Sequence, residues 1–370
     1  MKLGMIFYRH QLTRENFQYA RQLGCTHLVI HLTDYFYREK DPVSGDNQPI
    51  GDSEGWGVTR VRDVWTFEEL SAIREKVEGE GLIWEAIENF DPGFWYDVLL
   101  DGPQKHAQMD GLKQLIRNVG RAGIPVFGYN FSLAGVAGRV SGPFARGGAE
   151  SVGGNAPLDL PVPRGMVWNM VYDPEAPKGI ETAAQISHEE LWRRFEWFLS
   201  ELLPVAEESG VKLAAHPDDP PYAFLRGTPR LVWRPELYQK LLDLRESPCN
   251  ALELCVGTLA EMTGRNFYKS VETYAQRDAI GYVHLRNVTG QVPHYRETFI
   301  DDGDIDIYRV LKILSDNDFR GVVIPDHSPL VSSPAPWYVG MAYALGYIRA
   351  MIDRVEAEAA RRPRAPFPLD

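Results

Sequence analysis

Four side chains of metal-ligand type occupy comparable positions along the chain. His216, Cys255, His284 and Asp326 each lie at the end of a short apolar run or directly after one. Two imidazoles, a thiolate and a carboxylate suit a divalent first-row metal, and Zn²⁺, Fe²⁺, Co²⁺ and Mn²⁺ all fit this set. Mg²⁺ and Ca²⁺ prefer oxygen ligands. Each residue alone also has a structural interpretation, such as a small buried cysteine. Their recurrence at four strand ends favours a metal site.

The elements that must position these residues are short apolar runs alternating with amphipathic segments. Runs of this length and composition predict parallel strands buried on both faces. The predicted strands cover 3–7, 27–30, 83–87, 126–129, 212–215, 252–255, 282–285 and 322–324. Eight strand–helix units predict an α/β fold, a (β/α)₈ TIM barrel with its active site at the carboxyl ends of the strands. The alternative is a doubly wound sheet, but the turn after the first strand, 8–11, has no glycine.

The segments between the strands carry helix signals. Thr66 and Glu69 form a capping-box pattern at the start of one predicted helix. Predicted helices cover 66–80, 105–122, 188–209 and 305–317. We therefore expect a single barrel domain over 1–356 and a disordered tail over 357–370. A long Gly- and Pro-rich insertion, 132–186, follows the fourth strand and forms a lid, an oligomer contact or a surface excursion.

Composition excludes several classes of protein. The 370 residues include 39 Lys and Arg against 51 Asp and Glu, a net charge of −12, and 44% are hydrophobic. This composition is typical of a globular protein, and the negative net charge argues against nucleic acid as a partner. Three cysteines do not make a disulfide scaffold, and no apolar run is long enough to cross a membrane. The expected location is the cytoplasm.

Several motifs together resemble the mannonate dehydratase family. The most specific is His-Pro-Asp-Asp-Pro-Pro at 216–221. Shorter matches follow in order from about residue 65 to residue 346, at 129–131, 203–211, 255–258, 284–288, 303–308 and 325–327. The resemblance implies a xylose-isomerase-like barrel. It also implies a lyase, a hydro-lyase of carbohydrate metabolism that converts D-mannonate into 2-keto-3-deoxy-D-gluconate and water in hexuronate degradation.

The same resemblance implies roles for individual residues. The family's metal ligands correspond to the four strand-end residues already named, and its metal is usually Mn²⁺, with Fe²⁺, Co²⁺, Zn²⁺ or Mg²⁺ as alternatives. His327 and Tyr338 correspond to its catalytic histidine and tyrosine, with Tyr343 as a second candidate for the tyrosine. It also implies a homo-oligomer, a dimer or larger. Expected substrate-binding residues are Asn130, Arg139, Arg286 and Glu297.

Three departures from the family pattern bear on the substrate. Ile300 stands where the family has a histidine, Ala137 stands where it has a tryptophan, and the segment 89–95 differs throughout. We interpret these positions as substrate-facing, so the metal chemistry would be retained while the sugar acid or sugar could differ. The alternative functions are a metal-dependent sugar isomerase or epimerase on the same barrel, and a sugar-binding barrel without catalysis.

Overall fold

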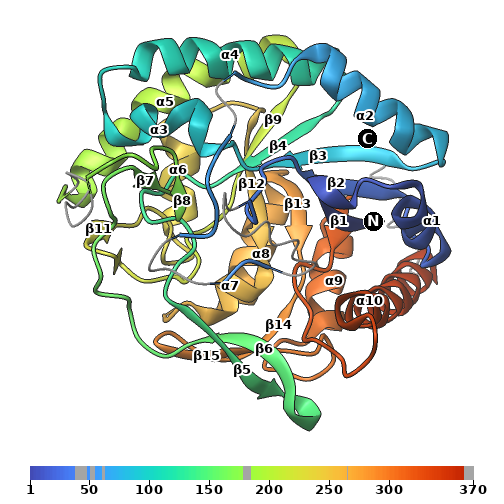
Figure 1. The fold of residues 1–370 in the computed structure, drawn as a ribbon. Helices are drawn as coiled ribbons and strands as arrows, with labels where there is room; N and C mark the ends of the chain where they lie inside the picture. Colours follow the sequence, from blue (N-terminus) through green and yellow to red (C-terminus); the bar gives the residue numbers. More distant parts are fainter. Residues whose placement is uncertain (38–47, 51–54, 61–62, 178–184, 265, 362–370) are drawn as a thin grey trace, which may run out of the picture.

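The eight predicted strands form one closed parallel barrel in the computed structural model of the protein (Figure 1). The structure describes residues 1–37, 48–50, 55–60, 63–177, 185–264 and 266–361. Around the barrel the strands follow the order β1-β16-β13-β12-β9-β4-β3-β2. They are β1 (Lys2–Tyr8), β2 (His27–His31), β3 (Ile83–Glu88), β4 (Val126–Tyr129), β9 (Lys212–Ala215), β12 (Asn250–Cys255), β13 (Ile280–His284) and β16 (Val322–Ile324). The predicted fold class is confirmed.

Helices surround this barrel, and the predicted ones form with nearly the predicted limits. Thr66 caps α2 and exchanges both capping-box hydrogen bonds with Glu69. The helices are α1 (Arg14–Gln22), α2 (Phe67–Gly79), α3 (Pro92–Leu100), α4 (Lys105–Arg121), α5 (His188–Ser209), α6 (Leu237–Leu244), α7 (Val256–Glu261), α8 (Phe267–Gln276), α9 (Ile307–Asp316) and α10 (Pro336–Arg361). Their apolar faces and the strands enclose one large hydrophobic core. No helix in the described ranges is long and apolar enough to span a bilayer.

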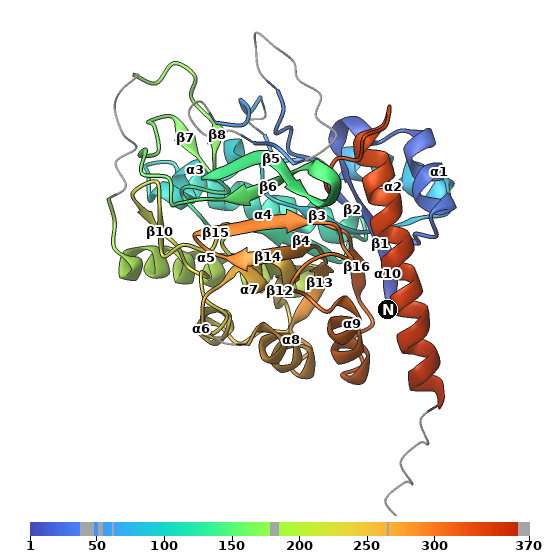
Figure 2. The ribbon, with the colours of Figure 1, turned by 90° about the horizontal axis from the view of Figure 1, so that it is seen from below.

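The insertion after β4 joins a second loop to form a sheet outside the barrel. Its strands β5 (Arg139–Ala145) and β6 (Ala149–Gly154) pair with the hairpin β14 (Asn287–Gln291) and β15 (His294–Thr298), which follows β13. The antiparallel order is β14-β15-β6-β5, and Figure 2 shows the four strands side by side. Gly154 allows this pairing, because a Cβ there would lie 2.3 Å from the ring of Tyr295. The loops after the fourth and seventh barrel strands are therefore tied together.

Smaller elements complete the loops. They are β7 (Met166–Val167) with β8 (Met170–Val171), β10 (Phe224–Leu225) with β11 (Thr228–Pro229), and the short helices η1 (Arg9–Gln11) and η2 (Arg146–Gly148). At the carboxyl end of the chain α10 continues to Arg361, so the first five residues of the tail predicted over 357–370 are helical. The remaining nine, 362–370, lie outside the described residues, as do 178–184 of the predicted insertion.

Candidate metal centre and cavity

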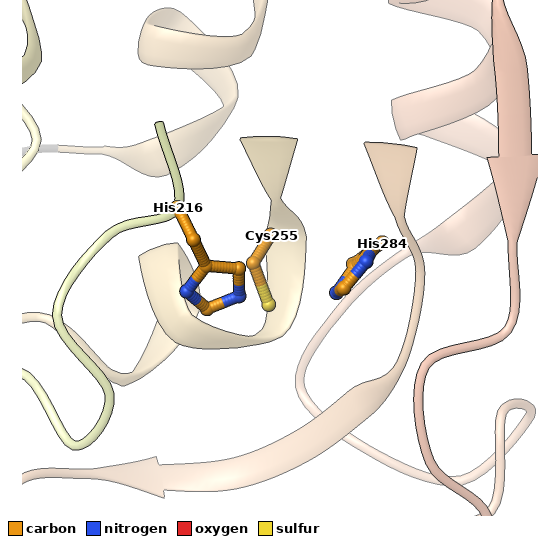
Figure 3. Close-up of side chains that lie close together, drawn as sticks. All are labelled: His216, Cys255 and His284. Atoms are coloured by element: carbon orange, nitrogen blue, oxygen red, sulfur yellow. The ribbon is translucent and has the colours of Figure 1, made fainter. Parts of the chain in front are cut away.

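Three of the predicted metal ligands converge at the carboxyl ends of neighbouring strands. His216 follows β9, Cys255 ends β12 and His284 ends β13. One ligand atom from each lies within 4.8 Å of the others, and Figure 3 shows the three side chains next to one another. Asp326, after β16, completes the set: its Oδ2 is 3.6 Å from Cys255 Sγ and its Oδ1 is 3.4 Å from His284 Nδ1. The structure brings all four residues together.

Hydrogen bonds decide which histidine nitrogens remain for a metal. His216 Nδ1 lies 2.7 Å from the carbonyl oxygen of Pro217 and must donate to it, so Nε2 keeps its lone pair. His284 Nε2 lies 3.2 Å from Glu88 Oε2 and 3.1 Å from Glu253 Oε1. Its buried Nδ1 makes no hydrogen bond among the described residues. Carboxylates on the outer nitrogen of a ligating histidine are a common feature of metal sites.

The carboxylate pair behind His284 is buried, with Glu253 inside the barrel and Glu88 at the lining of the cavity. Burial and the neighbouring Glu88 raise the pKa of Glu253. Burial opposes ionisation of Glu88 too, but His31 and His284 outweigh it and lower its pKa. Space for the pair comes from Gly128 on β4, where a Cβ would lie 2.4 Å from Glu253 Oε2. The site thus holds a nitrogen, sulfur and oxygen set that fits a divalent cation.

Arg286 and Arg139 approach this set but differ in how far their charge is neutralised. Arg286 is fully buried and contacts Cys255 Sγ at 3.2 Å. It also donates to the hydroxyl of Thr258 at 3.2 Å, and the carboxylates of Asp219, Glu261, Glu297 and Asp326 lie within ion-pair distance of it. Burial opposes its charge, but these acidic neighbours raise its pKa well above the usual value. The predicted role of Arg286 as a carboxylate clamp is therefore limited, because both terminal nitrogens of its guanidinium already donate to protein groups.

Arg139, at the start of β5, is the more available cation. It donates to the side-chain oxygen of Gln48 and, at 3.1 Å, to the carbonyl oxygen of Pro49. Its guanidinium carbon is 5.7 Å from the ring centroid of Trp56. No carboxylate of the described residues lies within ion-pair distance of it. Arg139 lines the same cavity as the metal-ligand set.

The cavity above the metal-ligand set has one charged wall and one aromatic wall. The charged wall includes Arg139, His216, Asp219, His284, Arg286, Asp326 and His327. The aromatic wall consists of Tyr8, His31, Tyr35, Trp56 and Trp168. Asn130 also lines the cavity, donates to the carbonyl oxygens of His216 and Pro217 at 3.3 Å each, and accepts from Trp168 Nε1. Such a site suits a polar molecule with both hydroxyl groups and C–H faces.

The two predicted catalytic residues have different positions. His327 lines the cavity, and its Nδ1 lies 3.0 Å from Glu297 Oε1. Tyr338 does not line it: its hydroxyl donates to Asn16 on α1, because the first turn of α10 directs this side chain between the two helices. Tyr343 is 43% exposed. The expectation of a tyrosine from α10 in the cavity is thus not met by either residue.

Tyr8 is the tyrosine that sequence reasoning missed. It ends β1, lines the cavity and stacks on His31 with ring centroids 5.1 Å apart. Burial, reinforced by the charge of Glu88, raises the pKa of Tyr8 far above the usual value, so the phenol remains protonated. Its position at a strand end is the signal that could have found it.

The three departures from the family pattern are not all at the cavity. Asn89 lines it and donates to the hydroxyl of Tyr35. Ile300 and Ala137 are buried in hydrophobic clusters and do not line the cavity. The side chains of Ile300 and Ala137 therefore do not face the cavity, although Val136 and Arg139, on either side of Ala137, line it. Little of the cavity wall is altered by these changes.

The closed parallel barrel and the ligand set at its carboxyl edge define the class of protein. They describe a (β/α)₈ barrel of the xylose-isomerase-like type with a candidate metal centre. Among solved structures, L-ribulose 3-epimerase shares this fold with a TM-score of 0.55 and 13% identity, covering 99% of both chains. That identity shows the fold alone.

Closer similarities identify the family. Residues 54–137 and 175–362 match the family model described as D-mannonate dehydratase (UxuA). A mannonate dehydratase of Streptococcus suis is 35% identical over 312 residues, 79% of this chain and 83% of that protein. The crystal structure of mannonate dehydratase from Streptococcus suis serotype 2 aligns with a TM-score of 0.74 and 25% identity, covering 100% of this chain and 97% of that one. The chain belongs to the D-mannonate dehydratase family and is an enzyme of the hydro-lyase class.

Proposed function

We propose that the protein removes water from D-mannonate to give 2-keto-3-deoxy-D-gluconate. The observation that carries this proposal is the convergence of His216, Cys255, His284 and Asp326 in a chain of this family. A divalent cation, Mn²⁺ first, would be held by these side chains and would offset negative charge that develops on the substrate carboxylate. The cavity residues around them have the chemistry needed for the two proton transfers.

His327 is suited to remove the proton from C2. Its Nδ1–H donates to Glu297, which leaves Nε2 to take the proton, and Asp326 Oδ1, 3.2 Å from Nε2, can accept from the protonated imidazolium. Burial opposes ionisation of Glu297, but His327 and Arg286 outweigh it and lower its pKa, which keeps an anion beside the imidazole. That anion stabilises the imidazolium formed when His327 accepts the proton.

Tyr8 is suited to donate the second proton. Its protonated hydroxyl lines the cavity. In this proposal Tyr8 gives its proton to the C3 hydroxyl of the substrate as the C3–O bond breaks. Water leaves, and the resulting enol becomes the 2-keto product by gaining a proton at C3 and losing the proton of its O–H group. The proton held by His327 then returns to the Tyr8 phenolate, which restores both groups. Tyr338 is the alternative donor, favoured by the family motif but separated from the cavity by its bond to Asn16.

The remaining cavity residues bind the sugar acid. Arg139 supplies the charge that is not committed to protein carboxylates, and Asn130 supplies an amide at the cavity wall. Arg286 and Glu297 act mainly by holding the other residues in place. The aromatic wall packs against the C–H groups of the carbon chain.

The test is incubation of the purified, Mn²⁺-loaded protein with D-mannonate, D-gluconate and D-altronate in D₂O, with product analysis by NMR and mass spectrometry. We expect a 2-keto-3-deoxy acid from D-mannonate, and none from a His327→Asn variant. Absence of that product from every aldonate would refute the proposal. Deuterium exchange into an aldose or ketose without loss of water would instead indicate an isomerase or epimerase.

Metal identity and assembly are part of the proposal. Metal analysis of the protein as purified should find Mn²⁺ in preference to Fe²⁺, Co²⁺, Zn²⁺ and Mg²⁺. A dimer or larger homo-oligomer is the assembly that the family resemblance implies. Light scattering that gives the mass of one chain would contradict this assembly.

A further inference from the structure

Gln48 connects two parts of the cavity that are far apart in the sequence. It lies in the segment between β2 and α2, and its side chain is buried. Its amide nitrogen donates to Glu297 Oε2 at 2.6 Å, and its amide oxygen accepts from Arg139 Nη1. Glu297 Oε1 in turn accepts from His327 Nδ1 at 3.0 Å. A continuous chain of hydrogen bonds therefore runs from Arg139 through Gln48 and Glu297 to His327.

The two neighbours of Gln48 determine which side chain can occupy its position. Arg139 has only donors and the ionised Glu297 has only acceptors. A bridging side chain must therefore accept at one end and donate at the other, which an amide does. A carboxylate at this position would face Glu297 at hydrogen-bond distance with no proton between them. A methionine of similar length would remove the partner of Arg139 Nη1 and of Glu297 Oε2 in a buried site.

The bridge also determines how His327 is held. One oxygen of Glu297 receives the imidazole N–H, and the other is fixed by Gln48. The carboxylate then cannot turn away from His327, so the imidazole keeps Nδ1–H toward Glu297 and Nε2 toward Asp326. Through the same amide, Arg139 is held at the cavity wall. Hydrogen-bond partners of this kind act on catalysis by orientation.

We propose that Gln48 is a positioning residue that fixes the tautomer and orientation of His327 and couples them to Arg139. The expected effect on kcat rests on the proposed function, whereas the tautomer of His327 can be measured without a reaction. Gln48 carries none of the transferred protons.

The test compares Gln48→Glu with the exchanged pair Gln48→Glu/Glu297→Gln. In the single variant two carboxylates meet. In the exchanged pair the carboxylate at position 48 accepts from Arg139, and the amide at position 297 donates to it and accepts from His327. We expect kcat for D-mannonate to fall about 10- to 100-fold in Gln48→Glu, with KM less affected, and the exchanged pair to recover about tenfold over that variant.

The chain provides a matched control on its surface. Gln239 on α6 also bridges an arginine and a carboxylate: it accepts from Arg277 and donates to Asp243. Gln239→Glu therefore makes the same chemical change in an exposed bridge outside the cavity. Its kcat and KM should equal those of the wild type.

A second measurement reports on His327 without turnover. Ring-¹⁵N histidine spectra of the Zn²⁺-loaded protein, with His327 assigned from a His327→Asn variant, should show the Nδ1–H tautomer in the wild type and in the exchanged pair. In Gln48→Glu this signal should shift or broaden. Unchanged His327 signals in Gln48→Glu, or an exchanged pair no faster than Gln48→Glu, would overturn the assignment. An inactive wild type with the expected spectra would refute the proposed function and leave the positioning role intact.

Discussion

The loop that carries His216 depends on a buried ion pair whose loss should be costly. Asp218 Oδ1 accepts from Arg230 Nε at 2.6 Å, and both side chains are almost completely buried. Asp218 Oδ2 also accepts from the backbone N–H groups of Leu231 and Val232, at 2.8 and 2.7 Å. This aspartate therefore belongs to the framework of the site and not to a solvated turn. The perturbation we consider is Asp218→Asn.

The magnitude follows from what the substitution leaves unpaired. An asparagine keeps the size of the side chain but removes the charge opposite the Arg230 guanidinium. Breaking a buried ion pair from one side costs about 3–5 kcal/mol. Asparagine has one side-chain oxygen, so either both backbone N–H groups lose their acceptor or the amide NH₂ faces the guanidinium, which costs about 1 kcal/mol more. We therefore expect Asp218→Asn to lower the free energy of unfolding by about 4–6 kcal/mol. The double variant Asp218→Asn/Arg230→Met should lose less of the free energy of unfolding, because no isolated charge remains.

The assay is urea unfolding followed by tryptophan fluorescence, with metal removed by a chelator from all samples. Asp318→Asn is the matched control, because its ion pair with Arg320 is exposed and its loss should leave the midpoint unchanged. A loss below about 1 kcal/mol for Asp218→Asn would refute the reasoning. A double variant less stable than Asp218→Asn would also contradict it, since the unpaired charge would then not be the cause.

Three further predictions concern the site itself. Cys255→Ala and His216→Ala should each lose the bound metal in elemental analysis; stoichiometric metal in both would mean that the ligand set is wrong. Tyr8→Phe should lower kcat by about 10²- to 10⁴-fold, whereas Tyr338→Phe should retain it; the reverse result would assign the proton to Tyr338. Burial disfavours the ionised form of Asp219, but Arg286 and Arg139 lower its pKa to about 2. Because the pKa of Asp219 is lower in the folded than in the unfolded protein, its ionised side chain adds about 2 kcal/mol to the free energy of unfolding above pH 4. This contribution is lost as the pH falls toward 2. Asp219→Asn should lack this part of the acid dependence in chelator-treated protein, and identical pH profiles would contradict the assignment.

The barrel and its metal-ligand set could be predicted because both follow from local patterns. Apolar runs mark buried parallel strands, and the residues that end such runs share one edge of the barrel, which brings His216 and Asp326 together although they are far apart in the chain. Tyr8 and His31 end β1 and β2, so the same signal extends to them.

The remaining parts of the site depend on tertiary contacts that no periodic pattern in the sequence indicates. Gln48 reaches the cavity from a segment without regular structure, and Trp168 reaches it from the turn between β7 and β8. Tyr338 lies on a helix whose rotation against α1 is set by side-chain packing, so its motif could not show that its hydroxyl meets Asn16. The pairing of β6 with β15 joins residues about 140 positions apart, such as Gly154 and Tyr295, and depends on glycines that make room for a ring.

The pairing of β6 with β15 makes the loop after β4 and the loop after β13 depend on each other. β15 carries Glu297, and it is flanked by β14 on one side and β6 on the other. Deleting the segment that contains β6 would leave β15 as an open sheet edge and remove Ser151, whose hydroxyl donates to the carbonyl oxygen of Glu297. A chimera that takes the loop after β4 from one barrel and the loop after β13 from another would therefore lose contacts that hold Glu297, the hydrogen-bond partner of His327. In recombination between relatives, the two loops must be exchanged together.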